Sequence, residues 1–133
     1  MVSTHQAPFR HRLTRDDVLG AAPDTATEAL VHLYRDAAER RPVAAGIAAL
    51  YAYERQVPAV ATAKIDGLRR HYGLDDDRTL AFFRVQSTLD EDHAGAEARI
   101  IEALGGSDAD VVVDTATDAL DAWWSFLDGV DQG

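Results

Sequence analysis

Apolar residues recur at intervals of three and four positions through most of this chain, from residue 24 to residue 127. This spacing places them on one face of an α-helix, whose period is 3.6 residues. The two-residue alternation of a half-buried strand does not persist anywhere, and Val111–Val113 is short and followed by helix-compatible sequence. The pattern therefore predicts an all-α fold, a helical bundle around one apolar core.

Capping residues and helix breakers divide this pattern into about four main helices and one short helix. Several of them begin at a residue that can cap a first turn, such as Thr14 or Asp24. Pro58 lies inside one of the long patterns, where a proline should kink or break the helix. The short helix is expected over residues 14–20, and the main helices over residues 24–40, 42–72, 76–104 and 109–127.

The length of the chain suits one domain with one core. It has 133 residues, of which 47% are apolar, so disorder of the whole chain is not expected. We expect a single helical domain over residues 13–130. A polar, flexible tail is expected over residues 1–12, and a short tail over residues 131–133.

Composition also restricts the classes of function. The chain has no cysteine, which excludes disulfides, zinc–thiolate sites, iron–sulfur clusters and cysteine nucleophiles. Its formal net charge of −10 argues against nucleic acid or an anionic membrane surface as a partner. No apolar run approaches the ~20 residues of a membrane span, and residues 1–12 lack the apolar core of a signal peptide. We therefore expect a cytoplasmic protein.

Ionisable residues interrupt the apolar faces of two expected helices. Asp90 and His93 stand three positions apart on one face, and Glu54 is the only acidic residue on the other. A buried carboxylate without a partner costs several kcal/mol or becomes neutral, and a divalent cation would remove that penalty for both acids. A carboxylate and a histidine at this spacing form half of the ligand pattern of a dinuclear site in a helix bundle. The face of the 76–104 helix consists of Leu80, Phe83, Gln86, Asp90, His93, Glu97, Ile100 and Leu104.

A purely structural arrangement is also compatible with this spacing. Asp90 could hydrogen-bond to His93, and Glu54 could pair with a basic residue of a neighbouring helix. The spacing alone leaves both interpretations open.

Aromatic residues surround the candidate ligands in the sequence. Tyr51 and Tyr53 flank Glu54, and together with Phe83 they are either core residues or the walls of a ligand pocket. We call Tyr51, Tyr53 and Phe83 the expected pocket residues. Trp123 is expected to be a core or interface anchor.

Longer motifs resemble those of a known family. Residues 51–73 read YAYERQVPAVATAKIDGLRRHYG, and residues 80–93 read LAFFRVQSTLDEDH. They resemble the patterns Y-x-Y-E-x-Q-x-P, K-x-x-G-L-x-x-x-Y-G and F-F-x-x-H-x-x-x-D-x-x-H. These belong to the C-terminal half of the heme-oxygenase-like dimetal oxidases and oxygenases, relatives of the pyrroloquinoline-quinone synthase and thiaminase folds. The ending WWSFLDGV at residues 123–130 and the opening at residues 13–34 also resemble this family.

The resemblance implies a metal site. By position, Glu54, Asp90 and His93 match metal ligands and are the expected catalytic residues, with iron or manganese as the metal. Gln86 stands where the family pattern has a ligand histidine, and its neutral carbonyl oxygen is a weaker ligand than imidazole. The family's N-terminal half supplies a further glutamate and histidine, for which the sequence upstream of Glu54 has no counterpart. The resemblance therefore implies a truncated relative with an incomplete ligand set.

Three functions follow from these residues. In the first, a homodimer buries the uncovered apolar face and supplies two copies of the candidate ligands, giving a metal-dependent oxidase or oxygenase for a small molecule in a biosynthetic pathway. In the second, a metal-free enzyme uses the same three residues as general acid and base beside the expected pocket residues. In the third, the chain is a non-catalytic partner or split half, and a second chain supplies the missing helices.

Overall fold

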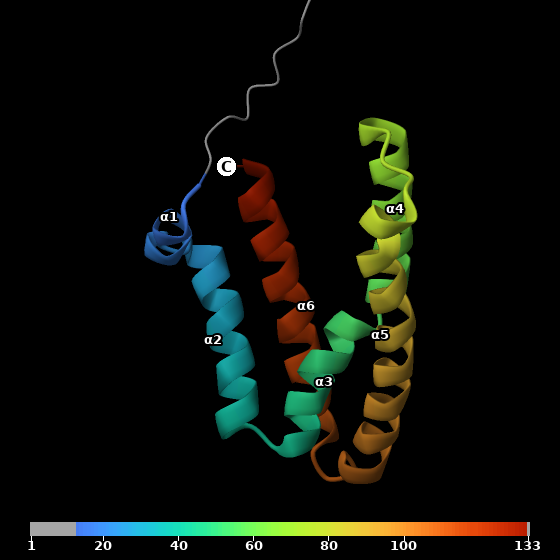
Figure 1. Ribbon diagram of the computed structural model, residues 1–133. Helices are drawn as coiled ribbons and strands as arrows, with labels where there is room; N and C mark the ends of the chain where they lie inside the picture. The colour runs from blue at the N-terminus through green and yellow to red at the C-terminus, as the bar shows by residue number, and fades with distance from the viewer. Residues whose placement is uncertain (1–12, 133) are drawn as a thin grey trace, which may run out of the picture.

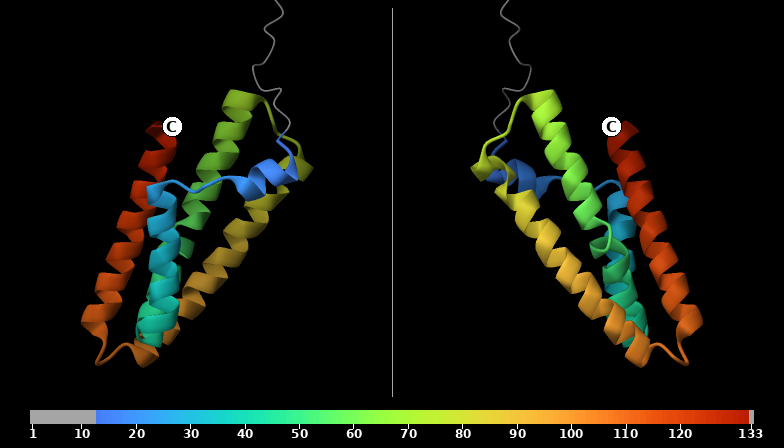
Figure 2. Two further views of the ribbon diagram at one scale, coloured as in Figure 1. Left: turned by 90° about the vertical axis from the view of Figure 1, so that its left-hand side faces the viewer. Right: turned by 90° about the vertical axis from the view of Figure 1, so that its right-hand side faces the viewer.

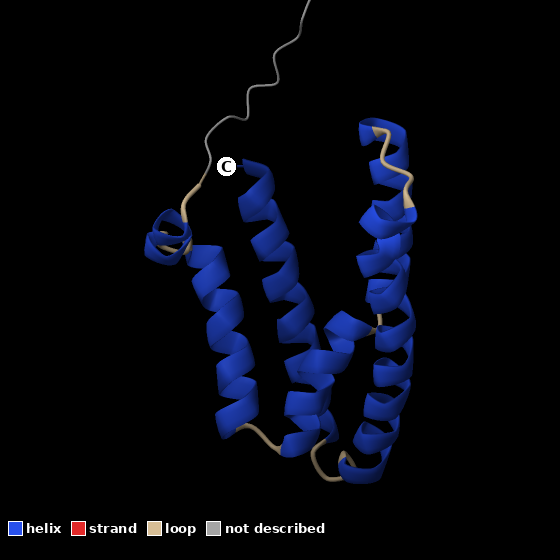
Figure 3. Cartoon of the chain, viewed as in Figure 1, coloured by secondary structure: helices blue, strands red, loops and turns tan. Residues whose placement is uncertain are grey.

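The computed structural model describes residues 13–132, and every element in that range is an α-helix (Figure 3). The predicted all-α fold is confirmed. Residues 1–12, predicted to be a flexible tail, lie outside the described residues, as does Gly133. In chain order the helices are α1 (Arg15–Gly20), α2 (Thr25–Arg40), α3 (Val43–Glu54), α4 (Val57–Tyr72), α5 (Asp77–Leu104) and α6 (Ala109–Gln132).

The helix predicted over residues 42–72 is divided into two. The chain turns at Arg55–Gln56, between α3 and α4. Pro58 lies in the first turn of α4, where its missing N–H removes no intrahelical hydrogen bond. The break expected from this proline therefore occurs just before it, and residues 13–132 contain five main helices rather than four. The predicted C-terminal tail is helical in its first two residues, because α6 continues to Gln132.

Successive segments of the chain reverse direction. α2 runs one way, α3 and α4 together run back, α5 returns, and α6 runs back again (Figure 1). The side views show that the long α5 extends from the end of α4 to the level of the start of α3 (Figure 2). α3 packs against both α5 and α6, whereas α4 packs mainly against α5. No helix in the described range is both long and apolar enough to cross a bilayer.

Alanine forms much of the core where α3 passes between its neighbours. Ala49 and Ala52 of α3 are buried in one cluster with Ala37 of α2 and Ala119 of α6. These short side chains let three helices approach closely. The candidate site lies where this tightly packed region ends.

Candidate metal centre

The three candidate ligands meet where the end of α3 lies against the middle of α5. Glu54 is the last residue of α3, and Asp90 and His93 lie within α5. The Nδ1 atom of His93 is 3.4 Å from Oε2 of Glu54 and 3.7 Å from Oδ1 of Asp90. One ligand atom from each residue lies within 4.8 Å of the other two. The structure therefore brings together the three residues that the sequence singled out.

The three side chains differ in their exposure to solvent. The side chain of Asp90 is 11% exposed, that of Glu54 is 21% exposed, and that of His93 is 57% exposed. The two carboxylates thus lie below the surface, while the imidazole lies on the solvent side of the cluster.

Buried oxygen atoms without partners mark the cluster as unsatisfied. Oε2 of Glu54 is buried and accepts no hydrogen bond, although Nδ1 of His93 lies 3.4 Å away, and Oε2 of Glu97 is likewise buried without a hydrogen bond. Burial and, next, the negative charge of Glu54 raise the pKa of Glu97 to about 7. A proton or a cation would stabilise two neighbouring carboxyl groups of this kind.

Glu97 is the site residue that sequence reasoning missed. It follows His93 by four positions, so it lies one turn further along the same face of α5. The periodicity of the sequence predicted that Glu97 lies on this face, but no role was predicted for it. An acidic residue one turn beyond a candidate histidine ligand was the available signal.

The donor set suits a divalent transition metal. Two carboxylates and one imidazole are ligands that iron and manganese accept. Ligand atoms bound at about 2.1 Å to one ion lie at most about 4.2 Å apart. The cluster, with its 4.8 Å limit, therefore needs only a small contraction to hold an ion.

A pocket of about 290 Å³ opens beside the cluster, between α4, α5 and α6. Asp90 lines it, so this carboxylate belongs to both the cluster and the pocket. Gln86 lies in the pocket wall one turn before Asp90. The lining residues are Tyr53, Gln56, Val57, Val60, Ala61, Lys64, Phe82, Phe83, Gln86, Asp90, Trp123, Phe126 and Leu127.

Two of the three expected pocket residues, Tyr53 and Phe83, line this pocket. Tyr51 does not, and its hydroxyl instead accepts a long hydrogen bond of 3.4 Å from Arg55. Positions two apart on a helix point in nearly opposite directions, so Tyr51 and Tyr53 could not both face one pocket.

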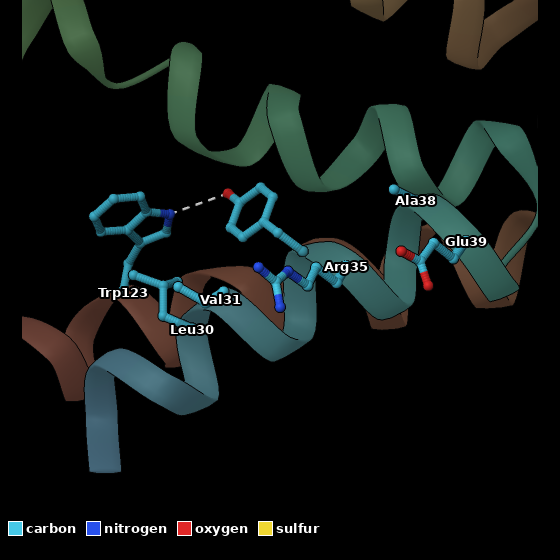
Figure 4. A pocket seen from close by; sticks show the side chains of 7 residues that line it. Leu30, Val31, Arg35, Ala38, Glu39 and Trp123 are labelled. Atoms are coloured by element: carbon cyan, nitrogen blue, oxygen red, sulfur yellow. Dashed lines mark hydrogen bonds between the residues drawn. The ribbon is translucent and has the colours of Figure 1, made fainter. Parts of the chain in front are cut away.

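Trp123 is the central aromatic residue of the pocket. Its ring stacks on Tyr53 with centroids 4.6 Å apart. Trp123 also lines a second, neighbouring pocket beside Leu30, and there its Nε1 donates a 3.0 Å hydrogen bond to the hydroxyl of Tyr34 (Figure 4). That hydroxyl donates in turn to the carbonyl of Ala49 at 2.9 Å. Burial is the main cause that raises the pKa of Tyr34. These contacts fix the wall of the pocket to the alanine core, as expected for an anchor.

Known proteins provide an independent comparison. A family model described as an iron-containing redox enzyme matches residues 9–124 of the chain. The chain belongs to this family. The resemblance to heme-oxygenase-like dimetal oxidases, inferred from residues 51–73 and 80–93, is thereby confirmed.

Individual members of the family are similar along most of this chain. It is 44% identical over 121 residues to the 4-aminobenzoate synthase of Nitrosomonas europaea, covering 89% of the chain and 47% of that relative. It is 32% identical over 123 residues to the 4-aminobenzoate synthase of Chlamydia trachomatis serovar D, covering 92% of the chain and 53% of that relative. The chain spans about half the length of the curated relatives it matches.

Proposed function

We propose that this chain binds iron through Glu54, Asp90 and His93 and takes part in the oxidative synthesis of a small aromatic molecule, 4-aminobenzoate. The observation that carries the proposal is the cluster of three ligand atoms beside a pocket with aromatic walls. The description of the family supports iron, and the names of the relatives support the product.

Each part of the site has a role in this proposal. Bound iron would supply oxidative chemistry that side chains cannot provide alone. The carboxylate of Asp90 connects the cluster to the pocket, so a molecule in the pocket lies next to the ligands. Tyr53 and Phe83 offer ring faces against which a flat molecule can pack while water is excluded. Lys64 and Gln86 offer a positive charge and an amide to its polar substituents.

The pocket volume also suits a small substrate. Sites for drug-sized ligands usually enclose about 300–1,000 Å³, and this pocket of about 290 Å³ lies just below that range. A single aromatic ring with one or two substituents is the size of molecule that it favours.

We further propose that a second copy of the chain covers the pocket and adds ligands to the cluster. Large apolar side chains around the pocket are exposed: Phe82 by 64%, Leu127 by 50% and Val60 by 45%. Exposed apolar surface next to a pocket is typical of an interface. A two-fold partner would bring a second Glu54 and a second Asp90–His93 pair, which matches the ligand number of a dinuclear bundle site.

Growth of a bacterial strain that cannot make 4-aminobenzoate tests the activity even while the substrate is unidentified. We expect the gene for this chain to restore growth, and Glu54→Gln to abolish the rescue. Glu102→Gln, which changes an exposed glutamate of α5, is the matched control and should still rescue. Rescue by the Glu54→Gln variant would show that the reaction does not need this cluster.

Metal content separates the remaining alternatives. Elemental analysis of the purified protein should find iron in the wild type and little in Glu54→Gln. Full activity after complete removal of metal by a chelator would favour the acid–base enzyme. Activity that requires a different second polypeptide would favour the split-half interpretation.

A further inference from the structure

We propose that Glu97 is a further metal ligand of this chain, which joins Glu54 on the side of the cluster away from the pocket. This inference rests on the proposed function, because it assumes that the cluster of Glu54, Asp90 and His93 binds a metal ion. It assigns to Glu97 a role that neither the motifs nor the three-residue cluster includes.

The first argument is position along α5. Gln86, Asp90, His93 and Glu97 follow one another at intervals of four, three and four residues, so they share one face of the helix. At a rise of 1.5 Å per residue, Gln86 and Glu97 lie about 16 Å apart along the axis. They therefore flank the Asp90–His93 pair on opposite sides, with Gln86 in the pocket wall.

The second argument is unsatisfied burial. Glu54 and Glu97 are neighbours whose charges influence one another, and each has a buried Oε2 without a hydrogen-bond partner. Within residues 13–132, neither carboxylate forms an ion pair with a lysine or arginine; Glu54 has only His93. Two neighbouring acids, each with a buried oxygen atom and no cation, are costly, and a divalent ion would satisfy both.

The third argument is the chemistry of the candidate ligands. Gln86 offers one neutral carbonyl oxygen, which binds iron or manganese weakly. Glu97 offers a carboxylate, which contributes charge as well as an oxygen atom. Its carboxylate lies outside the 4.8 Å cluster but close enough to Glu54 to feel its charge, so binding an ion would require Glu97 to change its side-chain torsions.

Titration of the metal-free protein with Mn(II) tests this role without reference to activity. The loss of the electron paramagnetic resonance signal of free Mn(II) gives the dissociation constant at pH 7.5. We expect Glu97→Gln to weaken binding by about tenfold or more, the scale on which groups at a metal site act. Glu54→Gln should abolish binding, and the exposed control Glu102→Gln should bind like the wild type.

The outcomes separate this inference from the proposed function. If the wild type binds no Mn(II), and Fe(II) under anaerobic conditions gives the same result, the proposed function fails. If the wild type binds and Glu97→Gln binds equally well, the proposed function stands and the role of Glu97 is overturned. Glu97→Asp keeps the carboxylate and should bind more tightly than Glu97→Gln. Equally weak binding by these two variants, with native helical circular dichroism, would also contradict a ligand role.

Discussion

Glu97 makes the stability of the metal-free protein depend on pH. Its pKa is raised from 4.5 to about 7, first by burial and then by the charge of Glu54. Between these two values the native state binds more protons than the unfolded chain, so the contribution of this group to the free energy of unfolding falls as pH rises. The destabilisation that comes from ionising Glu97 in the native state is therefore absent at low pH and complete above pH 7.

Replacing this group should therefore stabilise the metal-free protein at high pH. We expect Glu97→Gln to raise the free energy of unfolding more at pH 8 than at pH 5, in the presence of a chelator. Urea unfolding followed by circular dichroism measures both values. The exposed control Glu102→Gln should give the same small effect at both pH values. An equal effect of Glu97→Gln at pH 5 and pH 8 would mean that Glu97 is not the titrating group.

The candidate site was predictable only to the extent that one helix fixes it. Asp90 and His93 could be placed together because three positions along a helix determine their separation. The position of Glu54 beside them depends on how α3 packs against α5, which spacing within one helix cannot predict. Its assignment as a third ligand came from the resemblance to a family. The raised pKa of Glu97 depends on its burial and on the nearby charge of Glu54, and the periodicity of α5 reports neither.

At the scale of helices, Arg41 joins α2 and α6 from the loop between α2 and α3. Its Nε donates to Asp36 of α2 at 3.0 Å, and its Nη1 donates to Thr115 and Asp118 of α6 at 2.9 and 3.1 Å. The hydrogen bond to Asp36 is the largest cause that raises the pKa of Arg41. Only the branched guanidinium can serve all three partners at once.

Arg41→Lys should therefore destabilise the fold, although it keeps the charge. We expect a loss of about 1–2 kcal/mol in the free energy of unfolding, because a lysine amine cannot reproduce the forked hydrogen bonds and Thr115 is fully buried. Arg40→Lys is the matched control, because Arg40 is 73% exposed and 3.9 Å from Asp36. Its effect should stay below about 0.5 kcal/mol. Similar effects of the two substitutions in urea unfolding would contradict this role of Arg41.

Helix boundaries were predictable wherever a side chain creates them. Asp24 accepts a 2.7 Å hydrogen bond from the backbone of Thr27, and Gly73 ends α4 in the left-handed conformation with φ of 66°. Both boundaries depend on the local chemistry of one residue, so they can be predicted from the sequence. The end of α6 was predicted at Leu127, but the helix continues to Gln132. No proline follows Leu127 to stop it, and Gly129 lies within the helix.

At the scale of the whole molecule, the structure is closed at one end and open at the other. Around α3, alanine side chains allow α2, α3 and α6 to pack closely. Beyond the end of α3, α6 separates from α4 and α5 in the view of Figure 1, and the pocket is lined there by larger and partly exposed residues. The periodicity predicted the helices, but it could not predict this opening, because it depends on how helices diverge and not on any one of them.

If a second copy covers the open end, a charge placed there should separate the copies. We expect the purified protein to have twice the 14.5 kDa mass of one chain in light scattering coupled to size exclusion. Leu127→Asp should give a monomer, because it puts a charge into the apolar surface that borders the pocket. Val113→Asp is the matched control, since Val113 is an exposed apolar residue of α6 that does not line the pocket.

Metal binding should follow the assembly in the same samples. If the partner adds ligands, the Leu127→Asp monomer should bind Mn(II) more weakly than the wild type, although Leu127 is not itself a ligand. Val113→Asp should keep both the dimeric mass and the wild-type affinity. A wild-type monomer that binds metal tightly would contradict completion by a second copy. In that case the cluster of Glu54, Asp90 and His93 would be sufficient within one chain.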